Sequence, residues 1–276
     1  MRLSTLRRFT GLGLALALLL SVAACRKKAP IEIAPEIASS DEALFKLGEE
    51  AIKKDEEKGL LFLRQLMDSF PKSFYAQRAK LLIADAYFKK ADEGNLILAA
   101  SEYREFINLY PFSPSAAYCQ YQIGMTFYKK ALKPGRDQSK TAQALAELKK
   151  TVTLYPTSEQ AKSAQDKIKD CEERLAEHQF LIGSQYLNSR AYKAATSRLA
   201  EILTAYPNYS GMDRVYFALG EAYFRGQKNA EAMPYFTKLV SDYAKSPLAG
   251  KAQERLKEIE AAPKAKPPAA KPPVAK

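Results

Sequence analysis

Residues 216–236, YFALGEAYFRGQKNAEAMPYF, contain the pattern that decides the fold of this chain. A large residue is followed by Leu-Gly and then by Tyr, and an Ala-x3-Phe pair lies downstream: Tyr216, Leu219, Gly220, Tyr223, Ala232 and Phe236. The small residues let a first helix pack closely against a second one, and the aromatic residues fill the space between neighbouring hairpins. The stretch therefore predicts a helical hairpin that stacks against others of its kind.

Four similar copies lie upstream, and all five share one spacing. Twelve positions separate the small residue of the second helix from the position that closes the helix, at 59–71, 99–111, 144–156, 195–207 and 232–244. The closing residue is Ala244 in the last copy and proline, which cannot continue a helix, in the other four. This spacing is typical of the tetratricopeptide repeat. We therefore expect an all-α superhelix of five helical hairpins.

The copies differ in length, and the differences predict where the array is irregular. Longer gaps between the two helices of the second and third copies predict enlarged turns near Asp92–Asn95 and Lys133–Ser139. From Pro156 to the next small position the chain takes twenty-seven residues, where the other copies take thirteen. The extra residues lie in Ser158–His178, a charged run without helix breakers, so we expect a long helix after the third repeat.

These features divide the chain into five parts. We expect a lipoprotein signal peptide over residues 1–24, a lipidated N-terminus and spacer over 25–40, and repeats one to three over 41–157. Residues 158–261 would hold the long helix, repeats four and five and a C-terminal cap helix over Pro247–Glu260. Residues 262–276 contain only Ala, Lys, Pro and one Val, so a disordered tail is expected there.

The N-terminal segment has the composition of an export signal. Basic residues precede an apolar run over Gly11–Leu20, which suits a secretory signal but is too short to span a bilayer. Val22-Ala-Ala-Cys25 follows, so Cys25 is expected to become the acylated first residue of the mature chain. An ordinary signal followed by an incidental cysteine is the alternative. By resemblance to the enterobacterial sorting rule, Arg26 in place of Asp predicts the periplasmic face of the outer membrane.

The net charge of +12 does not predict a nucleic-acid partner. Most of the excess lies in the signal, beside Cys25 and in the tail, so the folded part is close to neutral and no nucleic acid is expected. Cys119 and Cys171 fall on predicted helices of different repeats. A disulfide between them is possible in an oxidising periplasm, but two buried free thiols are the expected state.

The sequence contains no constellation that predicts catalysis, a cofactor or a metal site. There is a single histidine, no zinc-type Cys/His spacing, and no phosphate-binding glycine loop after the signal. Adjacent carboxylates such as Glu56-Glu57 point to different helix faces, and Cys171 and His178 lie about 10 Å apart along one helix. The chain is therefore expected to bind other proteins and not to be an enzyme.

The first helices of the repeats line the concave face of a tetratricopeptide superhelix. In repeats one to three the positions facing this groove include aromatic residues interleaved with Arg and Lys: Phe45, Arg78, Phe88, Lys89, Tyr121, Tyr128 and Lys129. Such a groove suits an extended peptide with aromatic side chains, whose free carboxylate would meet a cation. The alternative is that these rings simply pack between hairpins.

Several segments carry a resemblance to a known family: Arg136-Asp137, Tyr155-Pro-Thr-Ser158, Arg174-Leu-Ala-Glu, Gln185-Tyr186, Arg190-Ala191-Tyr192 and the run from Arg198 to Pro207. In spacing they resemble the BamD (ComL) family of lipoproteins of the outer-membrane β-barrel assembly machine. The resemblance spans about Asp41–Glu260. The Ala/Lys/Pro tail has no counterpart in enterobacterial members, and the first repeat departs from the pattern at Ala51 and Gly59.

The resemblance implies particular partners. Members dock through their C-terminal half onto the POTRA domains of a BamA-like insertase, with accessory Bam lipoproteins, and their N-terminal half receives C-terminal peptides of unfolded outer-membrane proteins. Arg198 occupies the place of a family arginine at the insertase interface, and a solvated helix arginine is the alternative there. The alternative function is a periplasmic repeat lipoprotein that scaffolds cell-envelope or peptidoglycan machinery, similar to the YbgF/CpoB group. That group usually has a coiled coil before its repeats.

Overall fold

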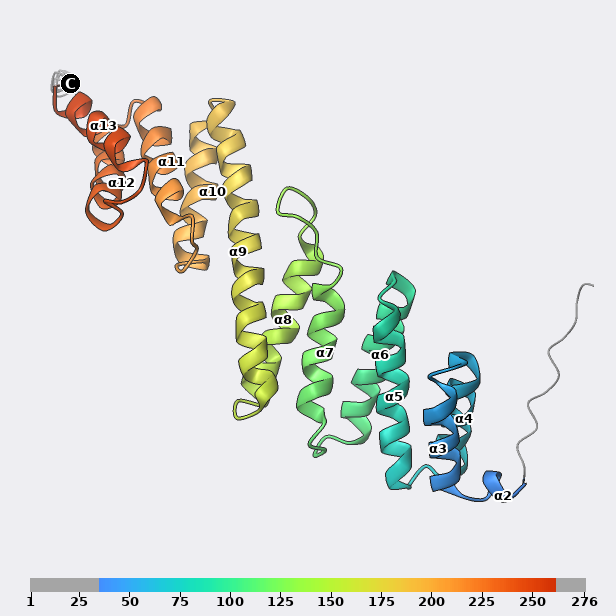
Figure 1. The fold of residues 1–276 in the computed structure, drawn as a ribbon. Helices are drawn as coiled ribbons and strands as arrows, with labels where there is room; N and C mark the ends of the chain where they lie inside the picture. The colour runs from blue at the N-terminus through green and yellow to red at the C-terminus, as the bar shows by residue number, and fades with distance from the viewer. Residues whose placement is uncertain (1–34, 262–276) are drawn as a thin grey trace, which may run out of the picture.

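The computed structural model describes residues 35–261, and within them the chain forms helices α2 to α13 and no strand (Figure 1). The helices are α2 Pro35–Ala38, α3 Asp41–Ala51, α4 Glu56–Ser69, α5 Phe74–Lys90, α6 Glu93–Leu109, α7 Ala116–Tyr128, α8 Ser139–Leu154, α9 Glu159–Asn188, α10 Tyr192–Ala205, α11 Met212–Arg225, α12 Asn229–Asp242 and α13 Ala249–Ala261. The predicted signal peptide, Cys25 and the Ala/Lys/Pro tail lie outside the described residues.

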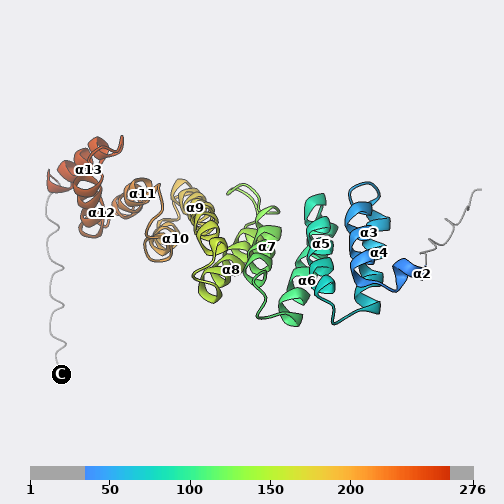
Figure 2. The ribbon, with the colours of Figure 1, turned by 60° about the horizontal axis from the view of Figure 1, so that its bottom comes forward.

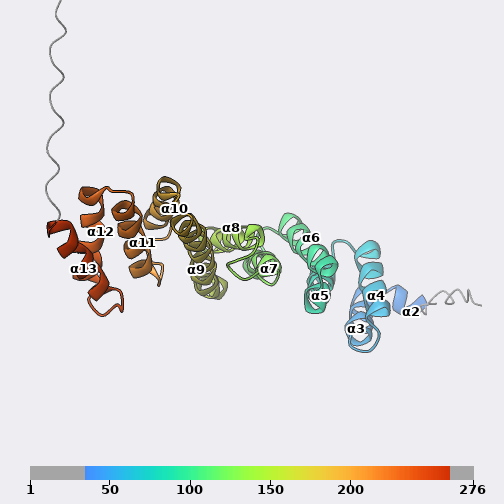
Figure 3. The ribbon, with the colours of Figure 1, turned by 90° about the horizontal axis from the view of Figure 1, so that it is seen from above.

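Consecutive helices pack as antiparallel pairs, which stack side by side into an elongated array. Figures 2 and 3 show the row from two further directions, with α2 at one end and α13 at the other. The prediction of an all-α tetratricopeptide-repeat array with a long helix in its middle is confirmed. The count of five repeats stays a prediction, because α9 packs against both α8 and α10 and so belongs to two neighbouring pairs.

The small residues of the pattern lie where helices cross most closely. At Gly220 on α11, an added Cβ would lie 2.5 Å from Cε1 of Phe236 on α12, closer than carbon atoms pack. Phe236 is fully buried, so the glycine and the ring fit together as one contact. The predicted close approach of the two helices at the small residue is therefore confirmed at this repeat, and Phe236 packs within the hairpin at this contact.

The turns between successive helices are flanked by characteristic residues, at the end of one helix or the start of the next. Helices α4, α5, α6 and α9 each begin after a Ser or Asp whose side chain accepts a hydrogen bond from a backbone N–H of the first turn: Asp55, Ser73, Asp92 and Ser158. The second helix of each pair ends at an aromatic residue in a non-helical conformation: Phe70, Tyr110, Tyr155, Tyr206 and Tyr243. The turns that follow these aromatic residues lie along one edge of the array, the lower edge in Figure 1, whereas Asp55 and Asp92 lie in turns within pairs at the opposite edge.

The two turns that were predicted to be enlarged differ. The prediction near Asp92–Asn95 is wrong, because α5 ends at Lys90 and α6 begins at Glu93, and the extra residues lengthen the two helices. The long loop after α7 is present, and Gln138 holds it by donating to the carbonyl oxygens of Lys133 at 2.8 Å and Arg136 at 3.1 Å. His178 Nδ1 on α9 lies 2.6 Å from the carbonyl oxygen of Pro134. The loop is therefore tied to the long helix.

Helix α9 runs unbroken for 30 residues and joins the two halves of the array. Its middle is fixed to the α10–α11 turn by Glu177, which accepts hydrogen bonds from Arg214 at 2.6 Å and from the hydroxyl of Tyr209. Although burial opposes ionisation, the hydrogen bonds from Arg214 and Tyr209 hold the pKa of Glu177 below its usual value. Glu173 accepts from the backbone N–H of Ser210 at 2.9 Å. These contacts hold the α10–α11 turn and the start of α11 in a fixed position relative to the long helix α9.

The two cysteines of the described region are free and buried, as expected. Burial raises the pKa of Cys119 to about 12 and that of Cys171 to about 11, so both are thiols at neutral pH. Among residues 35–261, no helix has the length and apolar character needed to cross a membrane. The expected spacer contains one short helix, α2, which leads directly into α3.

Candidate functional site

A cleft of about 550 Å³ lies where the α3–α4 turn approaches α5. Its lining comes from the α3–α4 turn, the first residue of α4 and the C-terminal half of α5: Ile52, Lys53, Lys54, Glu56, Leu82, Asp85, Ala86, Lys89 and Lys90. The apolar members can contact an apolar side chain, while the lysines surround it with positive charge. This combination fits a short segment of chain that carries both an apolar group and an anion.

The lysines of the cleft are not equivalent. Lys90 forms an ion pair with Glu56, with 2.8 Å between Nζ and Oε1, so its charge is already matched. Lys54 and Lys89 are exposed and form no ion pair with any residue in the range 35–261 that the structure describes. Both also lie near the C-terminal ends of helices, where a cation is stabilised by the helix dipole. Together with Lys53, which is also exposed and has no ion pair among residues 35–261, they are the cations available to an incoming carboxylate.

Asp85, an acidic residue of the cleft lining, accepts hydrogen bonds from two tyrosines of the neighbouring helices. Its Oδ1 accepts hydrogen bonds from the hydroxyls of Tyr103 on α6 at 2.6 Å and Tyr118 on α7 at 2.8 Å. Gln122 donates in turn to the Tyr118 hydroxyl at 2.8 Å. Burial raises the pKa of Asp85 although both hydroxyls oppose the shift, and burial also raises the pKa of Tyr118 to about 12. The network joins three helices beneath the cleft.

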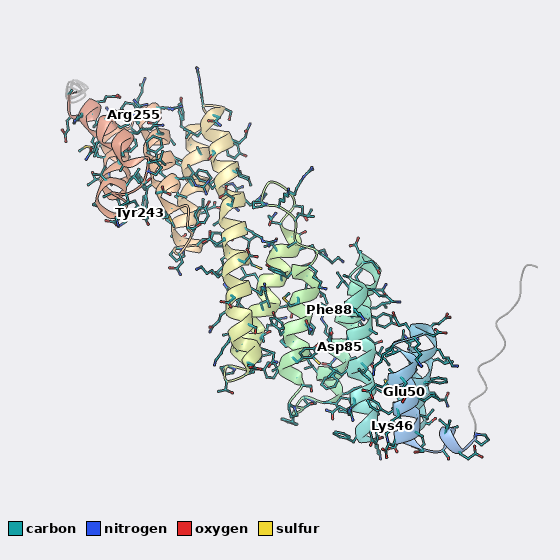
Figure 4. All side chains as sticks on the ribbon, in the orientation of Figure 1. Lys46, Glu50, Asp85, Phe88, Tyr243 and Arg255 are labelled. Carbon is teal, nitrogen blue, oxygen red and sulfur yellow. The ribbon has the colours of Figure 1, made fainter. Side chains whose placement is uncertain are left out.

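Phe88 lies on the same side of α5 as Asp85, about one helical turn further along. Figure 4 labels Asp85 and Phe88 on the side of α5 that faces α7. The ring of Phe88 packs edge-on against Tyr103 with 6.3 Å between centroids, and Lys129 Nζ lies 4.2 Å from the Phe88 centroid. Cation–π contacts of this kind keep a lysine beside an aromatic surface. Phe88 and Lys129, two of the predicted groove residues, are thus brought together across two neighbouring pairs.

Two of the predicted groove residues are packed into the structure instead. Phe45 is 2% exposed and lies in the core of the first pair, so the prediction that it lines an open groove is wrong. The guanidinium of Arg78 covers its ring at 4.4 Å, and Arg78 itself is exposed. Tyr128 bridges α7 to α9: its hydroxyl donates to Asp170 at 2.5 Å, and burial raises its pKa to about 12. Tyr121 is half-buried on the same helix.

The lining residues that sequence reasoning missed are those of the α3–α4 turn. Ile52, Lys53, Lys54 and Glu56 lie at the end of the weakest repeat, where the pattern gives little guidance. One signal was present: Lys53-Lys54, Lys89-Lys90 and Lys129-Lys130 all stand at or just after the end of a first helix. Equivalent positions of stacked repeats lie along one edge, so this signal could have placed the three lysine pairs at the same edge of the array.

The predicted partner-interface residue, Arg198, lies on α10 and is exposed. Its single ion pair is with Glu201 on the same helix at 3.5 Å, which is a weak surface contact. Within the described part of the chain, the guanidinium is therefore free to meet a carboxylate of another molecule. No group of three or more His, Cys, Asp or Glu side chains within residues 35–261 could hold a metal ion.

The fold and cleft define the class of this protein as a tetratricopeptide-repeat array. A family model described as YfiO, outer membrane lipoprotein, matches residues 37–232, and the chain belongs to this family. The outer membrane protein assembly factor BamD of Caulobacter vibrioides is 29% identical over 77% of this chain and 69% of its own. BamD of Rickettsia prowazekii is 26% identical over 78% and 82%. The resemblance found in the sequence is therefore confirmed.

Solved structures were also compared with the array. The TPR2AB domain of yeast Sti1 in a complex named for pHSP90 covers 79% of this chain and 84% of its own, with 16% identity and a TM-score of 0.41. The P58(IPK) TPR domain covers 80% and 56%, with 15% identity and a TM-score of 0.39. Neither the family's description nor the relatives' names is that of an enzyme.

Proposed function

We propose that this protein is an outer-membrane protein assembly factor, anchored by lipid at Cys25 and built to hold two different partners at once. The family match over residues 37–232 carries the proposal. The proposed partner-binding helix is α10, on which Arg198 is exposed, and the second proposed site is a lysine-rimmed cleft some five helices away in the chain. In this function the anchor keeps the array at the periplasmic face of the outer membrane, and the array connects a client chain to the insertase.

The C-terminal half is the proposed docking surface for the POTRA domains of a BamA-like insertase. Arg198 supports this because it is exposed and only weakly paired. An arginine can bind a carboxylate through two parallel hydrogen bonds, which gives both strength and orientation. The contacts of Glu177 and Glu173 with the α10–α11 turn keep α10 in a fixed position relative to the long helix. Accessory lipoproteins of the same machine are further proposed partners.

The Arg198→Glu variant tests the docking surface. We expect the amount of a POTRA-containing barrel protein that co-purifies from detergent-solubilised envelopes to fall at least about tenfold, because a like charge facing an interface carboxylate costs several kcal/mol. The control is Lys58→Glu, the same charge change at an exposed site on α4, outside the C-terminal half, which should leave recovery unchanged. Recovery of peptidoglycan-associated proteins without any barrel protein would contradict the assembly function and favour the envelope-scaffold alternative.

The N-terminal cleft is the proposed binding site for C-terminal peptides of unfolded outer-membrane proteins. The apolar side chains Leu82 and Ala86 can contact an aromatic terminal residue, while Lys54 and Lys89 can meet its free carboxylate. Lys129 and Phe88 extend the surface toward α7, in the direction that a longer peptide would follow. An extended peptide of this kind matches the curvature of stacked first helices.

Reversing the charge at Lys89 tests the cleft. The Lys89→Glu variant should bind a labelled peptide that ends in phenylalanine with a free carboxylate about tenfold more weakly than the unmodified protein, a change of about 1.4 kcal/mol. An amidated copy of the peptide lacks the carboxylate, so the two proteins should bind it with similar affinity. Fluorescence anisotropy measures both. Lys162→Glu, which changes an exposed lysine near the start of α9, is the control variant. Equal losses for both peptides would show that Lys89 does not contact the terminal carboxylate.

A further inference from the structure

The turns between the first three helix pairs carry two aromatic side chains that face solvent. Phe112, in the α6–α7 turn, is 98% exposed, and Phe74, at the start of α5, is 69% exposed. We call these two turns, residues 70–74 and 110–115, the aromatic edge. Two leucines near the ends of α6 and α8 lie at the same end of their helices, Leu109 at 55% and Leu154 at 61% exposed. Isolated exposed hydrophobics are ordinary, but a nearly fully exposed phenylalanine on a turn is not.

Hydrogen bonds hold the backbone of both turns in place, which sets where the two rings leave the array. Ser73 N–H donates to the Phe70 carbonyl at 2.9 Å, and Ser113 N–H donates to the Tyr110 carbonyl at 3.0 Å. The hydroxyl of Ser73 also donates to Asp41 at 2.5 Å, which ties the first turn to the start of α3. The second turn carries a proline on each side of Phe112-Ser113, which restricts its backbone further. The protein thus presents the rings outward at fixed positions.

The chain enters the fold at this same edge. Helix α3 and helix α5 both begin there, and α2 lies beside the start of α3 at the lower edge in Figure 1. Cys25 precedes Pro35 by ten positions, which is a reach of at most about 35 Å even when fully extended. A lipid attached at Cys25 therefore holds the first pairs close to the bilayer. The chain that leads from Cys25 joins the fold at the aromatic edge.

We propose that the aromatic edge lies in the surface of the membrane to which Cys25 is anchored, with Phe74 and Phe112 among the lipid headgroups. This rests on the proposed lipid anchor. Phenylalanine and leucine are side chains that enter the boundary between headgroups and acyl chains. The 70–74 and 110–115 turns contain one charged residue, Lys72, so immersion requires little loss of ionic hydration. The acyl chains supply the affinity, and the rings set which edge of the array faces the lipid.

The consequence is a defined orientation. With the aromatic edge in the headgroups, the opposite edge, which carries the three lysine pairs and the mouth of the cleft, points away from the bilayer. A client chain arriving from the periplasm would then meet the lysines first. Without such contacts, a chain held at the surface only by its lipid would have no preferred orientation.

Tryptophan fluorescence tests this, because the protein contains no tryptophan of its own. The lipidated full chain with Phe112→Trp is incorporated into vesicles of phosphatidylethanolamine with a minor share of phosphatidylglycerol. We expect its emission to shift to shorter wavelength and to be quenched by phospholipids with brominated acyl chains. The matched control is Leu132→Trp, which replaces a side chain that is 50% exposed in the loop at the opposite edge and should show neither effect. Phe112 and Leu132 both lie in loops and outside the buried core, so neither change should unfold the array.

Each outcome decides the question. A shift and quenching for Phe112→Trp alone support the proposal. No change in either variant, or the same change in both, overturns it, and a shift without quenching overturns it in favour of a protein contact at this edge. The intact mass of the purified chain separates these failures from failure of the anchor: an unacylated Cys25 would overturn the anchor and this inference together, whereas an acylated chain with an unquenched Phe112→Trp signal leaves the anchor intact.

Discussion

Replacing Gly59 with alanine is expected to destabilise the first helix pair, although alanine is the residue that the repeat pattern calls for at this position. Alanine favours helix by about 1 kcal/mol over glycine. A Cβ at position 59, however, would lie 2.4 Å from the backbone N and 2.5 Å from the Cα of Ile52. Backbone atoms cannot rotate away as a side chain can, so the α3–α4 turn must move. We expect a net loss of about 1–3 kcal/mol in the free energy of unfolding of this pair.

The local loss is measured by hydrogen exchange of α3 and α4 amides, because repeat arrays do not unfold as a single two-state unit. The control is Gly94→Ala on α6, where the nearest atom to an added Cβ is Asp92 Oδ1 at 3.6 Å. That change has space and should stabilise its helix by up to about 1 kcal/mol. A Gly59→Ala protein as well protected as the parent would show that the turn accommodates the methyl group.

The Gly59→Ala substitution is also expected to affect peptide binding in the cleft. The turn that must move carries Ile52, Lys53 and Lys54, which line the cleft. The Gly59→Ala variant is therefore expected to weaken binding of the carboxylate-terminated peptide in parallel with its loss of protection, while docking through Arg198 on distant α10 stays intact. Gly59, which departs from the repeat pattern, thus allows the α3–α4 turn to approach α4 closely and to line the cleft.

Removing the carboxylate of Glu221 is expected to release the last helix. Glu221 on α11 is 2% exposed and accepts hydrogen bonds from Arg225 Nε at 2.7 Å and from Arg255 Nε on α13 at 2.5 Å. Arg255, labelled in Figure 4, also lies over the ring of Phe224 at 4.9 Å. The Glu221→Ala variant leaves both guanidinium groups without this partner. Because the arginines are partly exposed and can be rehydrated, we expect a loss of about 2–3 kcal/mol.

The loss should appear as faster hydrogen exchange of α13 amides, with α3 to α8 unchanged. Glu258→Ala is the matched control: it removes another carboxylate that contacts Arg255, at 2.8 Å, but this one is half exposed. An exposed pair contributes about 1 kcal/mol or less, so α13 should stay protected. Similar exchange in the two variants would mean that α13 is held by the apolar contacts of Ala252 and Ile259 and not by the buried carboxylate.

How far the sequence predicts the candidate site can be argued from particular residues. The sequence assigns Phe88, Lys89 and Lys129 to the groove-facing side of the first helices, and the structure places Lys129 over the Phe88 ring. That these residues bind a peptide stays a prediction. Phe45 occupies a comparable place in the pattern but is buried, since Arg78 and Tyr75 close over it. The pattern assigns a residue to a face of its helix, whereas the depth at which it lies depends on neighbours from other helices.

The sequence by itself determined the all-helical class, the hairpin repeat and the long central helix, because these depend on short-range spacing of small, aromatic and proline residues. Only the tertiary structure decided that the gap near Asp92 lengthens helices instead of the turn, that Tyr128 bridges to α9, and that a cleft opens beside the α3–α4 turn. The physical reason is that helix ends, side-chain burial and clefts depend on how neighbouring pairs pack. Those contacts join residues tens of positions apart, as Tyr128 and Asp170 show, and no local spacing encodes them.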